Sequence, residues 1–293
     1  MKGVVILTLG HAYWGRWAYN LAMSLKYQSP DINISLLYAG DGISQIKDTS
    51  LFDKFIKIPE KYYLTNGRKE YMKVKTALYK LSPYETTICL DADTIWINQK
   101  SINDLFEELK DENFTMANRS FMDLEEERIT DEFGVWASPN YIKKKFNFTK
   151  GKFYNLSSEM IYFKKDKKDN DKKVSKLFSD AFKIYDKPLE HRIFNGGMPD
   201  ELPFTISMIK NDIYPHIDNY MPFYWEAAQL PPKRLTGGDL SPYYAYSMGG
   251  HMAHPIMKKT YDNFVKFYGK QFNVMHPYLW IDKRAYMPER NNL

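Results

Sequence analysis

The first hundred residues alternate short apolar runs with apolar positions at helical spacing, and this alternation constrains the fold more than any other feature of the chain. Residues 4–9 form a continuous apolar run of strand length. Trp14, Trp17 and Leu21 then recur at helical spacing, which predicts a helix over residues 13–27 with one buried face. Strands that alternate with helices in this way are typical of an α/β fold, with a mostly parallel central sheet flanked by helices.

The same pattern continues along the chain. Further strands are expected at residues 32–38, 54–58 and 87–90, with a helix over residues 71–81 between the last two. Later segments predict helices at 102–109, 174–184 and from 261, and strands at 114–117 and 160–163. Because no repeat and no low-complexity linker interrupts this pattern, we expect a single domain over residues 1–293.

The composition is that of a globular protein whose charge is nearly balanced. The chain has 293 residues, 44% of them hydrophobic, and 41 basic against 36 acidic residues. This mild positive excess suits a phosphate-bearing ligand without forming the basic face that nucleic-acid recognition needs. The lone Cys89 permits no disulfide within the chain, so a reducing compartment is expected. Since no early apolar run reaches the length of a signal or a membrane span, the sequence predicts a cytoplasmic protein.

Two carboxylates follow directly after one of the predicted strands. Asp91 and Asp93 come immediately after the apolar run 87–90, with Ala92 between them. Ligands of open α/β sheets bind beyond the carboxyl ends of the strands. Two carboxylates at such a position can hold Mg²⁺ or Mn²⁺, with a substrate diphosphate completing the coordination. The competing interpretation is a solvated loop after a strand.

The residues around this pair resemble a known family. The segment from Lys75 to Ile95 is similar, without a gap, to the Lys-helix-Leu-x-x-Tyr-strand-Asp-Ala-Asp block of glycogenin-like enzymes, glycosyltransferase family 8. Residues 7–13 are similar to the first strand and loop of that family. The resemblance implies a GT-A fold with a nucleotide-binding part at residues 1–100, a sugar and acceptor part at 101–260, and a C-terminal helix and tail at 261–293.

The resemblance also implies roles for individual residues. Donor-binding roles fall on Leu7, Leu9, Gly10 and Tyr13, which would line the base and ribose pocket, on Lys75, and on Asp91, Ala92 and Asp93 at the metal and diphosphate. For Tyr13 the competing interpretation is an aromatic side chain packed in the core at the start of a helix. For Lys75 it is a solvated lysine beside the apolar face of its helix.

Two segments in the second half of the chain are similar to the family's sugar-binding and acceptor-facing segments. In residues 154–163, Ser157 and Ser158 occupy the polar positions that contact the donor sugar, and Glu159 stands where the family has Gly. In residues 195–204, Asp200 and Glu201 are the catalytic candidates. These two acids also precede an apolar run, so a helix N-cap is the alternative interpretation.

The family's third metal ligand is a histidine near the C-terminus, followed by a lysine that binds the diphosphate. Residues 249–259 contain His251 and His254 together with Lys258 and Lys259, but lack the family's usual Gly and its Lys-Pro-Trp ending. The spacing to Lys258 favours His251 over His254 as the metal ligand.

The sequence therefore predicts a metal-dependent glycosyltransferase that uses a nucleotide-sugar donor, with a UDP-sugar favoured and retention implied by the resemblance. Its acceptor is a glycan, a protein or a modified DNA. A nucleotidyltransferase is the second hypothesis. Such an enzyme normally has a Gly-rich, basic phosphate-binding loop after its first strand, and residues 9–16 match that loop only weakly, with Arg16 as the one basic side chain. A non-catalytic glycan-binding or nucleic-acid-binding protein is the third.

Overall fold

The structure is a computed structural model, and it describes residues 1–46, 48–97, 100–126, 136–166, 172–191, 197–225, 240–249 and 255–273. The contacts within the chain divide it into two compact units. The first unit comprises Met1–Val5, Phe55–Leu90 and Glu108–Met221, and the second comprises Ile6–Lys54, Asp91–Glu107 and Pro222–Leu293. The predicted single domain, with its division near residues 100 and 260, stays a prediction.

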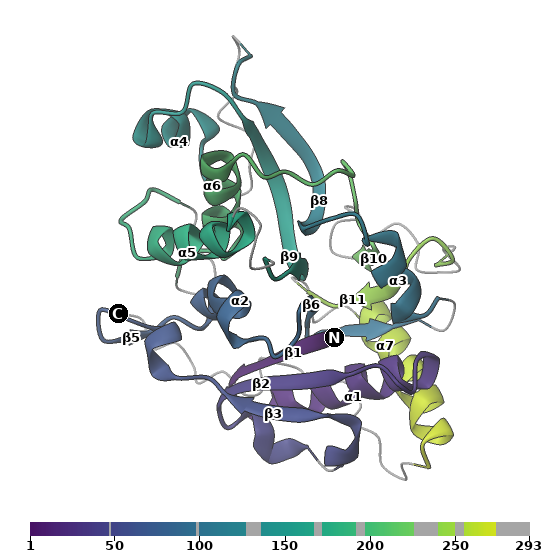
Figure 1. Ribbon diagram of the computed structural model, residues 1–293. Coiled ribbons are helices and arrows are strands. Elements are labelled where there is room, and N and C mark those ends of the chain that lie inside the picture. Colours follow the sequence, from purple (N-terminus) through teal and green to yellow (C-terminus); the bar gives the residue numbers. More distant parts are fainter. Residues whose placement is uncertain are drawn as a thin grey trace. The chain divides into compact units, whose positions relative to one another are not determined.

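The α/β architecture predicted from the sequence is confirmed. A six-stranded sheet has the order β3-β2-β1-β6-β9-β8. Its strands are β1 (Lys2–Gly10), β2 (Ile34–Gly40), β3 (Lys54–Lys57), β6 (Thr86–Asp91), β8 (Phe114–Asp123) and β9 (Lys152–Lys164), and Figure 1 labels each of them. The central sheet is mostly parallel and is flanked by helices, while β9 pairs antiparallel with both β6 and β8.

The first unit packs two helices against its long antiparallel strands. It contains η3 (Glu60–Tyr62), β4 (Leu64–Thr65), β5 (Arg68–Lys69), η4 (Tyr71–Ala77), α2 (Leu78–Leu81), α4 (Pro139–Phe146), α5 (Lys173–Tyr185) and α6 (Glu201–Asn211). Helix α5 packs on α6, and α6 packs on β9 (Figure 1). Phe178 of α5 lies at the centre of this core, with ring centroids 4.9 Å from Phe163, 5.4 Å from Phe204 and 5.7 Å from Phe114.

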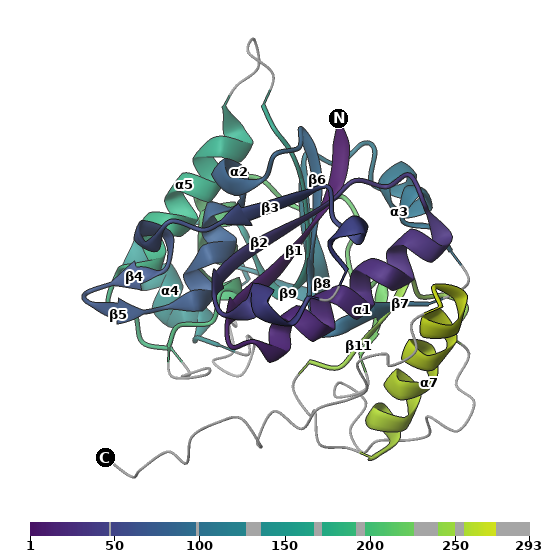
Figure 2. The ribbon, with the colours of Figure 1, turned by 90° about the horizontal axis from the view of Figure 1, so that it is seen from below.

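The second unit is built around α1. It contains α1 (Tyr13–Gln28), η1 (Gly42–Gln45), η2 (Thr49–Leu51), β7 (Thr94–Trp96), α3 (Ile102–Glu108), β10 (Phe223–Trp225), β11 (Ala245–Ser247) and α7 (Pro255–Gln271). Helix α7 packs along α1 (Figure 2), where Asn20 donates a 2.6 Å hydrogen bond to the hydroxyl of Tyr261. The hydroxyl of Tyr268 donates to the carbonyl of Trp96 at 2.6 Å, so this C-terminal helix also anchors the short strand that follows Asp93.

Three predicted elements differ from the structure. The segment predicted as one helix over residues 71–81 forms the 3₁₀ helix η4 followed by the single α-helical turn α2. Apolar residues three apart fit both helix types, so their spacing did not distinguish them. The strands predicted at 114–117 and 160–163 are parts of the much longer β8 and β9. In the described part of the chain, no helix is long and apolar enough to cross a membrane.

Candidate functional site

The carboxylate pair of the second unit lies in a turn whose backbone is fixed on both sides. Asp91 is the last residue of β6, and Thr94, the first residue of β7, donates its hydroxyl to the Asp91 carbonyl at 2.8 Å. Asp91 is partly exposed, whereas Asp93 is buried. A rigid turn that presents two carboxylates matches the oxygen ligands that Mg²⁺ and Mn²⁺ prefer. Two carboxylates supply the donor type that a divalent cation prefers, but the described residues contain no group of three or more His, Cys, Asp or Glu side chains that could hold a metal ion by themselves.

Strand β11 connects this turn to the segment with the candidate histidines. It pairs antiparallel with β7, with Ser247 opposite Thr94, and the next residue, Met248, donates its N–H to the Asp93 carbonyl at 2.9 Å. His251, three positions further along the chain, lies outside the described residues, as does His254. Lys258 is described, on α7, and its side chain is exposed.

The predicted base and ribose residues lie at the end of β1 and the start of α1. Leu7 is buried, Leu9 is partly exposed, and Gly10 has a left-handed φ of 83°. Close backbone approach explains the neighbouring Gly40, where a Cβ would lie 2.6 Å from the Gly10 carbonyl oxygen. These residues stay candidates for nucleotide contact.

Tyr13 is the first residue of α1 and is buried, as the packing interpretation expects. Its ring stacks on that of His11, with centroids 5.6 Å apart and planes 11° from parallel. Burial and the nearby negative charge of Asp93 raise the pKa of Tyr13 to about 12. The tyrosine therefore keeps its proton at neutral pH, and its role toward a nucleotide base stays a prediction.

The first unit contains a buried cluster of charged groups at the start of α6. Lys75 of η4 lies with its Nζ 3.0 Å from Asp200 Oδ2, and the two side chains are 6% and 2% exposed. The same ammonium donates to the hydroxyl of Ser158 at 2.9 Å and to its carbonyl at 3.2 Å. Ser157, the neighbouring candidate, is also buried in β9. The interpretation of Lys75 as a solvated lysine is wrong, because burial and an ion pair fix it.

Asp200 occupies the N-cap position of α6, but its side chain makes no capping hydrogen bond. The carboxylate instead pairs with Lys75. Burying the Asp200 carboxylate costs free energy, because a charge removed from water needs a partner. A carboxylate that caps a helix at the protein surface carries no such cost. The N-cap interpretation therefore accounts for the place of Asp200 at the start of α6. It does not account for the ion pair of its side chain with Lys75.

Glu201, in the first turn of α6, follows Asp200 directly in the chain and shares its buried surroundings. Its Oε1 accepts a 3.0 Å hydrogen bond from Ser158, while Oε2 is enclosed without a hydrogen bond from any described residue. Burial, reinforced by the negative charge of Asp200, raises the pKa of Glu201 to about 8. The carboxyl group is thus protonated over most of the neutral range and can itself donate a hydrogen bond.

An irregularity in the sheet places Ser158 in this cluster. The register of β8 on β9 changes between Met116, which lies opposite Ile161, and Ala117, which lies opposite Ser157. Ser158 and its neighbour Glu159 fall in the interval that β8 does not pair. Strand irregularities of this kind turn side chains towards functional sites, and here the irregularity coincides with the Ser158 contacts to Lys75 and Glu201.

Arg119 of β8 is a member of this cluster that the sequence did not indicate. Burial lowers its pKa, and the nearby acids Glu159 and Glu201 oppose that shift. Glu159, which departs from the family pattern, is therefore one of the acids around a partly buried arginine. Nothing in the local sequence marked Arg119, because its neighbours Glu159 and Glu201 come from distant parts of the chain.

A cavity of about 470 Å³ in the first unit lies elsewhere. It is lined by residues at the start of β8, the end of β9 and the end of α6, among them Glu112, Lys164, Asp212 and His216. No candidate residue lines it. A much smaller cavity, of about 10 Å³, is lined by Glu201 and by β9 residues, a size that matches one water molecule.

Comparison with known proteins identifies the architecture that carries these residues. No protein-family model and no curated protein matches the chain. Among solved structures, the galactosyltransferase LgtC in complex with donor and acceptor sugar analogs is similar over 92% of this chain and 96% of its own, with a TM-score of 0.52 and 14% identity. The chain has a GT-A fold.

Two further solved structures share this GT-A fold. An active-site mutant of LgtC is similar over 92% of this chain and 96% of its own, with a TM-score of 0.53 and 12% identity. The bifunctional glycosyltransferase WbbM is similar over 85% of this chain and 46% of its own, with a TM-score of 0.51 and 10% identity. At these identities the likeness shows the fold alone, because one fold can carry many unrelated functions.

Proposed function

We propose that this chain is a metal-dependent glycosyltransferase that moves a sugar from a nucleoside-diphosphate sugar, with a UDP-sugar favoured, to a glycan, protein or modified-DNA acceptor. The observation that carries the proposal is the buried cluster of Lys75, Ser158, Asp200 and Glu201. Deeply buried ionisable groups are typical of functional sites, and burial raises the pKa of Glu201. The family resemblance places Lys75 toward the donor, and Ser158, Asp200 and Glu201 on the sugar-binding and acceptor-facing segments. The GT-A fold supports the same reaction class.

The metal ligands in this proposal are Asp91, Asp93 and His251, and Lys258 is the diphosphate-binding lysine. The direct hydrogen bond from Met248 to the Asp93 carbonyl supports His251, because three residues of extended chain span only about 10 Å. A bound cation supplies Lewis-acid chemistry, offsetting the negative charge that grows on a departing diphosphate.

Within the cluster, each group has a defined task. Lys75 balances the charge of Asp200 and fixes its carboxylate, which orients the sugar or the acceptor hydroxyl. Glu201 keeps its proton in the neutral range because burial raises its pKa, so it donates a hydrogen bond to a sugar oxygen. Catalysis then rests mainly on positioning and on fixed electrostatics. We infer from the family resemblance that the anomeric configuration is retained.

The decisive experiment measures transfer or hydrolysis with a panel of nucleotide sugars in the presence of Mn²⁺. Asp93→Ala and Asp200→Asn should each abolish turnover, and a chelator should abolish it in the unmodified protein. Release of the nucleoside diphosphate, rather than pyrophosphate, distinguishes this reaction from nucleotidyl transfer. Turnover that survives both chelation and Asp93→Ala would refute the metal-dependent mechanism.

A further inference from the structure

Two residues at the C-terminal end of α5, Tyr185 and Asp186, contact the segments that carry Lys75 and Asp200. Each of the two residues contacts one segment. Lys75 belongs to η4, and Asp200 precedes α6. Tyr185 ends α5, and Asp186 follows it as the C-cap. Neither residue belongs to the set of donor or acceptor candidates, yet each makes a short polar contact with one of the two segments.

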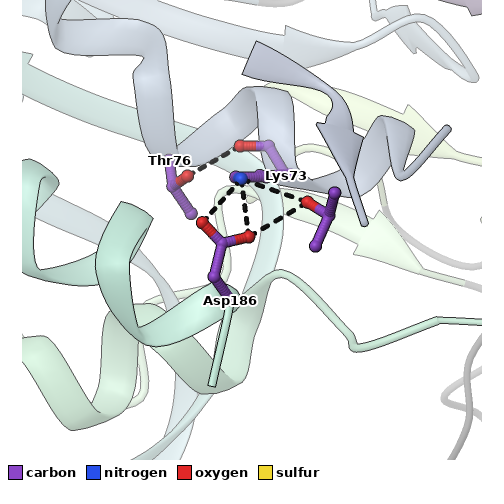
Figure 3. A network of polar contacts seen from close by, with 4 residues as sticks. Lys73, Thr76 and Asp186 are labelled. Carbon is purple, nitrogen blue, oxygen red and sulfur yellow. Dashed lines mark hydrogen bonds and ion pairs between the residues drawn. The ribbon is translucent and has the colours of Figure 1, made fainter. Parts of the chain in front are cut away.

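Asp186 holds η4 through Lys73. The Lys73 ammonium lies 2.6 Å and 2.8 Å from the two carboxylate oxygens of Asp186 (Figure 3). The ammonium lies 3.1 Å from the hydroxyl of Thr65. It also lies 4.3 Å from the ring centroid of Phe182, one turn earlier on α5. Lys73 is only 3% exposed. A buried cation held by a carboxylate, a hydroxyl and an aromatic face has little freedom to move.

Lys73 and Lys75 share one short 3₁₀ helix, so holding one lysine restricts the other. Three residues complete a turn of such a helix, and residues two apart point in different directions. Thr76 donates its hydroxyl to the Lys73 carbonyl at 2.7 Å, which ties the turn together (Figure 3). Lys73 therefore faces the end of α5 while Lys75 faces Ser158 and Asp200.

Tyr185 holds the other segment. Its hydroxyl donates a 2.9 Å hydrogen bond to the carbonyl of Met198, two residues before Asp200. Burial raises the pKa of Tyr185 above its ordinary value, and the negative charge of Asp200 adds to the shift. The hydroxyl thus remains a donor at any pH at which the protein functions.

The two held segments also touch each other directly. A Cβ on Gly197 would lie 2.4 Å from Oε2 of Glu70, the residue before η4. This carboxylate ends a flexible side chain that can move away, so the contact is a close approach of the two segments and not a rigid link.

From these contacts we propose that Tyr185 and Asp186 are positioning residues that set the geometry of the Lys75–Asp200 pair. The contacts hold whatever the chain catalyses, but the catalytic importance of this geometry rests on the proposed function. Loss of either contact should leave the chain folded, while Lys75 shifts away from Asp200 and loses part of its protection from water.

The first test observes Lys75 without any substrate. The ¹⁵N-labelled lysine ammonium signals are recorded by NMR, and the Lys75 signal is assigned by its absence in Lys75→Met. Tyr185→Phe and Asp186→Asn should shift this signal and accelerate its hydrogen exchange with water at least severalfold. Tyr185→Phe removes one oxygen atom and keeps the ring, so it decides the outcome even if Asp186→Asn fails to fold.

Matched controls lie on the same helix and in the same unit. Asp180→Asn removes a carboxylate of α5 that pairs with Lys210 at 2.8 Å, and Tyr79→Phe removes a hydroxyl that donates to Asp166 at 3.0 Å. Both should leave the Lys75 signal unchanged. A Lys75 signal that responds equally to the controls, or that does not respond to Tyr185→Phe in a folded protein, overturns the proposal.

The second test uses turnover. With an accepted nucleotide sugar, Tyr185→Phe should lower kcat about tenfold to a hundredfold with little change in KM, as expected when reacting groups are misplaced by a fraction of an ångström. Altered Lys75 exchange in a chain without transferase activity would refute the proposed function and uphold the positioning role. Unaltered Lys75 exchange in an active transferase would refute the positioning role and leave the proposed function standing.

Discussion

Lys75 and Asp200 form an ion pair of 3.0 Å from which water is almost excluded on both sides. Removing two charges from water costs several kcal/mol each, and a close partner with additional hydrogen bonds offsets that cost. Here Ser158 supplies the additional hydrogen bond acceptors for Lys75. Because desolvation offsets much of the attraction within a buried pair, stability alone is a weak reason to retain one, and buried charged groups of this kind are typical of functional sites.

Breaking this pair from one side should be strongly destabilising. Lys75→Met leaves the Asp200 carboxylate buried opposite an apolar side chain, and the free energy of unfolding should fall by about 3–5 kcal/mol in urea titrations. Lys26→Met is the matched control, since the carboxylate that it leaves, Asp53 at 3.8 Å, is 39% exposed. Its effect should be clearly smaller. Equal losses in the two variants would show that the burial of Lys75 has no special cost.

The stability of the chain should fall as the pH rises through the neutral range because of Glu201. Its pKa is raised from 4.5 to about 8 in the folded state. Between these values the folded protein binds a proton that the unfolded chain has released, so stability decreases with rising pH by at most about 1.4 kcal/mol per pH unit. The loss is complete above the folded-state pKa.

Glu201→Gln should remove this part of the pH dependence, because the amide stays neutral. Urea unfolding of both proteins across the window gives the two slopes, and the difference between them isolates Glu201. An identical slope in Glu201→Gln would mean that the carboxyl group is already ionised in the folded protein below neutral pH.

Metal-linked donor binding should depend on Asp93. A nucleotide sugar that binds the folded protein raises its Tm by mass action, and Mn²⁺ should enlarge that rise. Asp93→Asn should abolish the Mn²⁺-dependent part, since an amide is a poorer ligand for a hard cation. Asp31→Asn, at an exposed carboxylate of the same unit, should retain it. A full Mn²⁺ effect in Asp93→Asn would place the cation elsewhere.

Gly15 should tolerate no side chain although it lies within α1. A Cβ there would come within 1.9 Å of the Gly42 carbonyl oxygen, which belongs to the backbone and cannot rotate away. Gly15→Ala should therefore destabilise the protein, against the gain of about 1 kcal/mol that alanine normally brings to a helix.

Gly67→Ala provides the comparison for Gly15. Among the described residues, no atom lies within 4 Å of its added Cβ, so its φ of 78° is what opposes a side chain. Thermal unfolding of both variants should show the larger loss for Gly15→Ala. If Gly15→Ala were instead stabilising, the close approach of α1 to Gly42 would be incorrect.

The local sequence predicted which segments carry the candidate residues. It did not predict the burial of these residues or their charged neighbours. The apolar run before Asp91 places that residue at a strand end, because burial and strand length are both visible in consecutive residues. The 3₁₀ form of η4 was not visible, since Tyr71 and Val74 fit either helix. Arg119 was missed for a different reason, as its charged neighbours are remote in sequence.

The sequence by itself determined the strand and helix alternation and the position of Asp91 and Asp93 at the end of β6, because periodicity and local order are properties of neighbouring residues. Only the tertiary structure decided that Lys75 is buried against Asp200, that Glu201 keeps its proton, and that Tyr185 and Asp186 hold the segments on which the pair depends. Burial, pKa and ion pairing arise when distant segments exclude water together, and no short stretch of sequence contains that information.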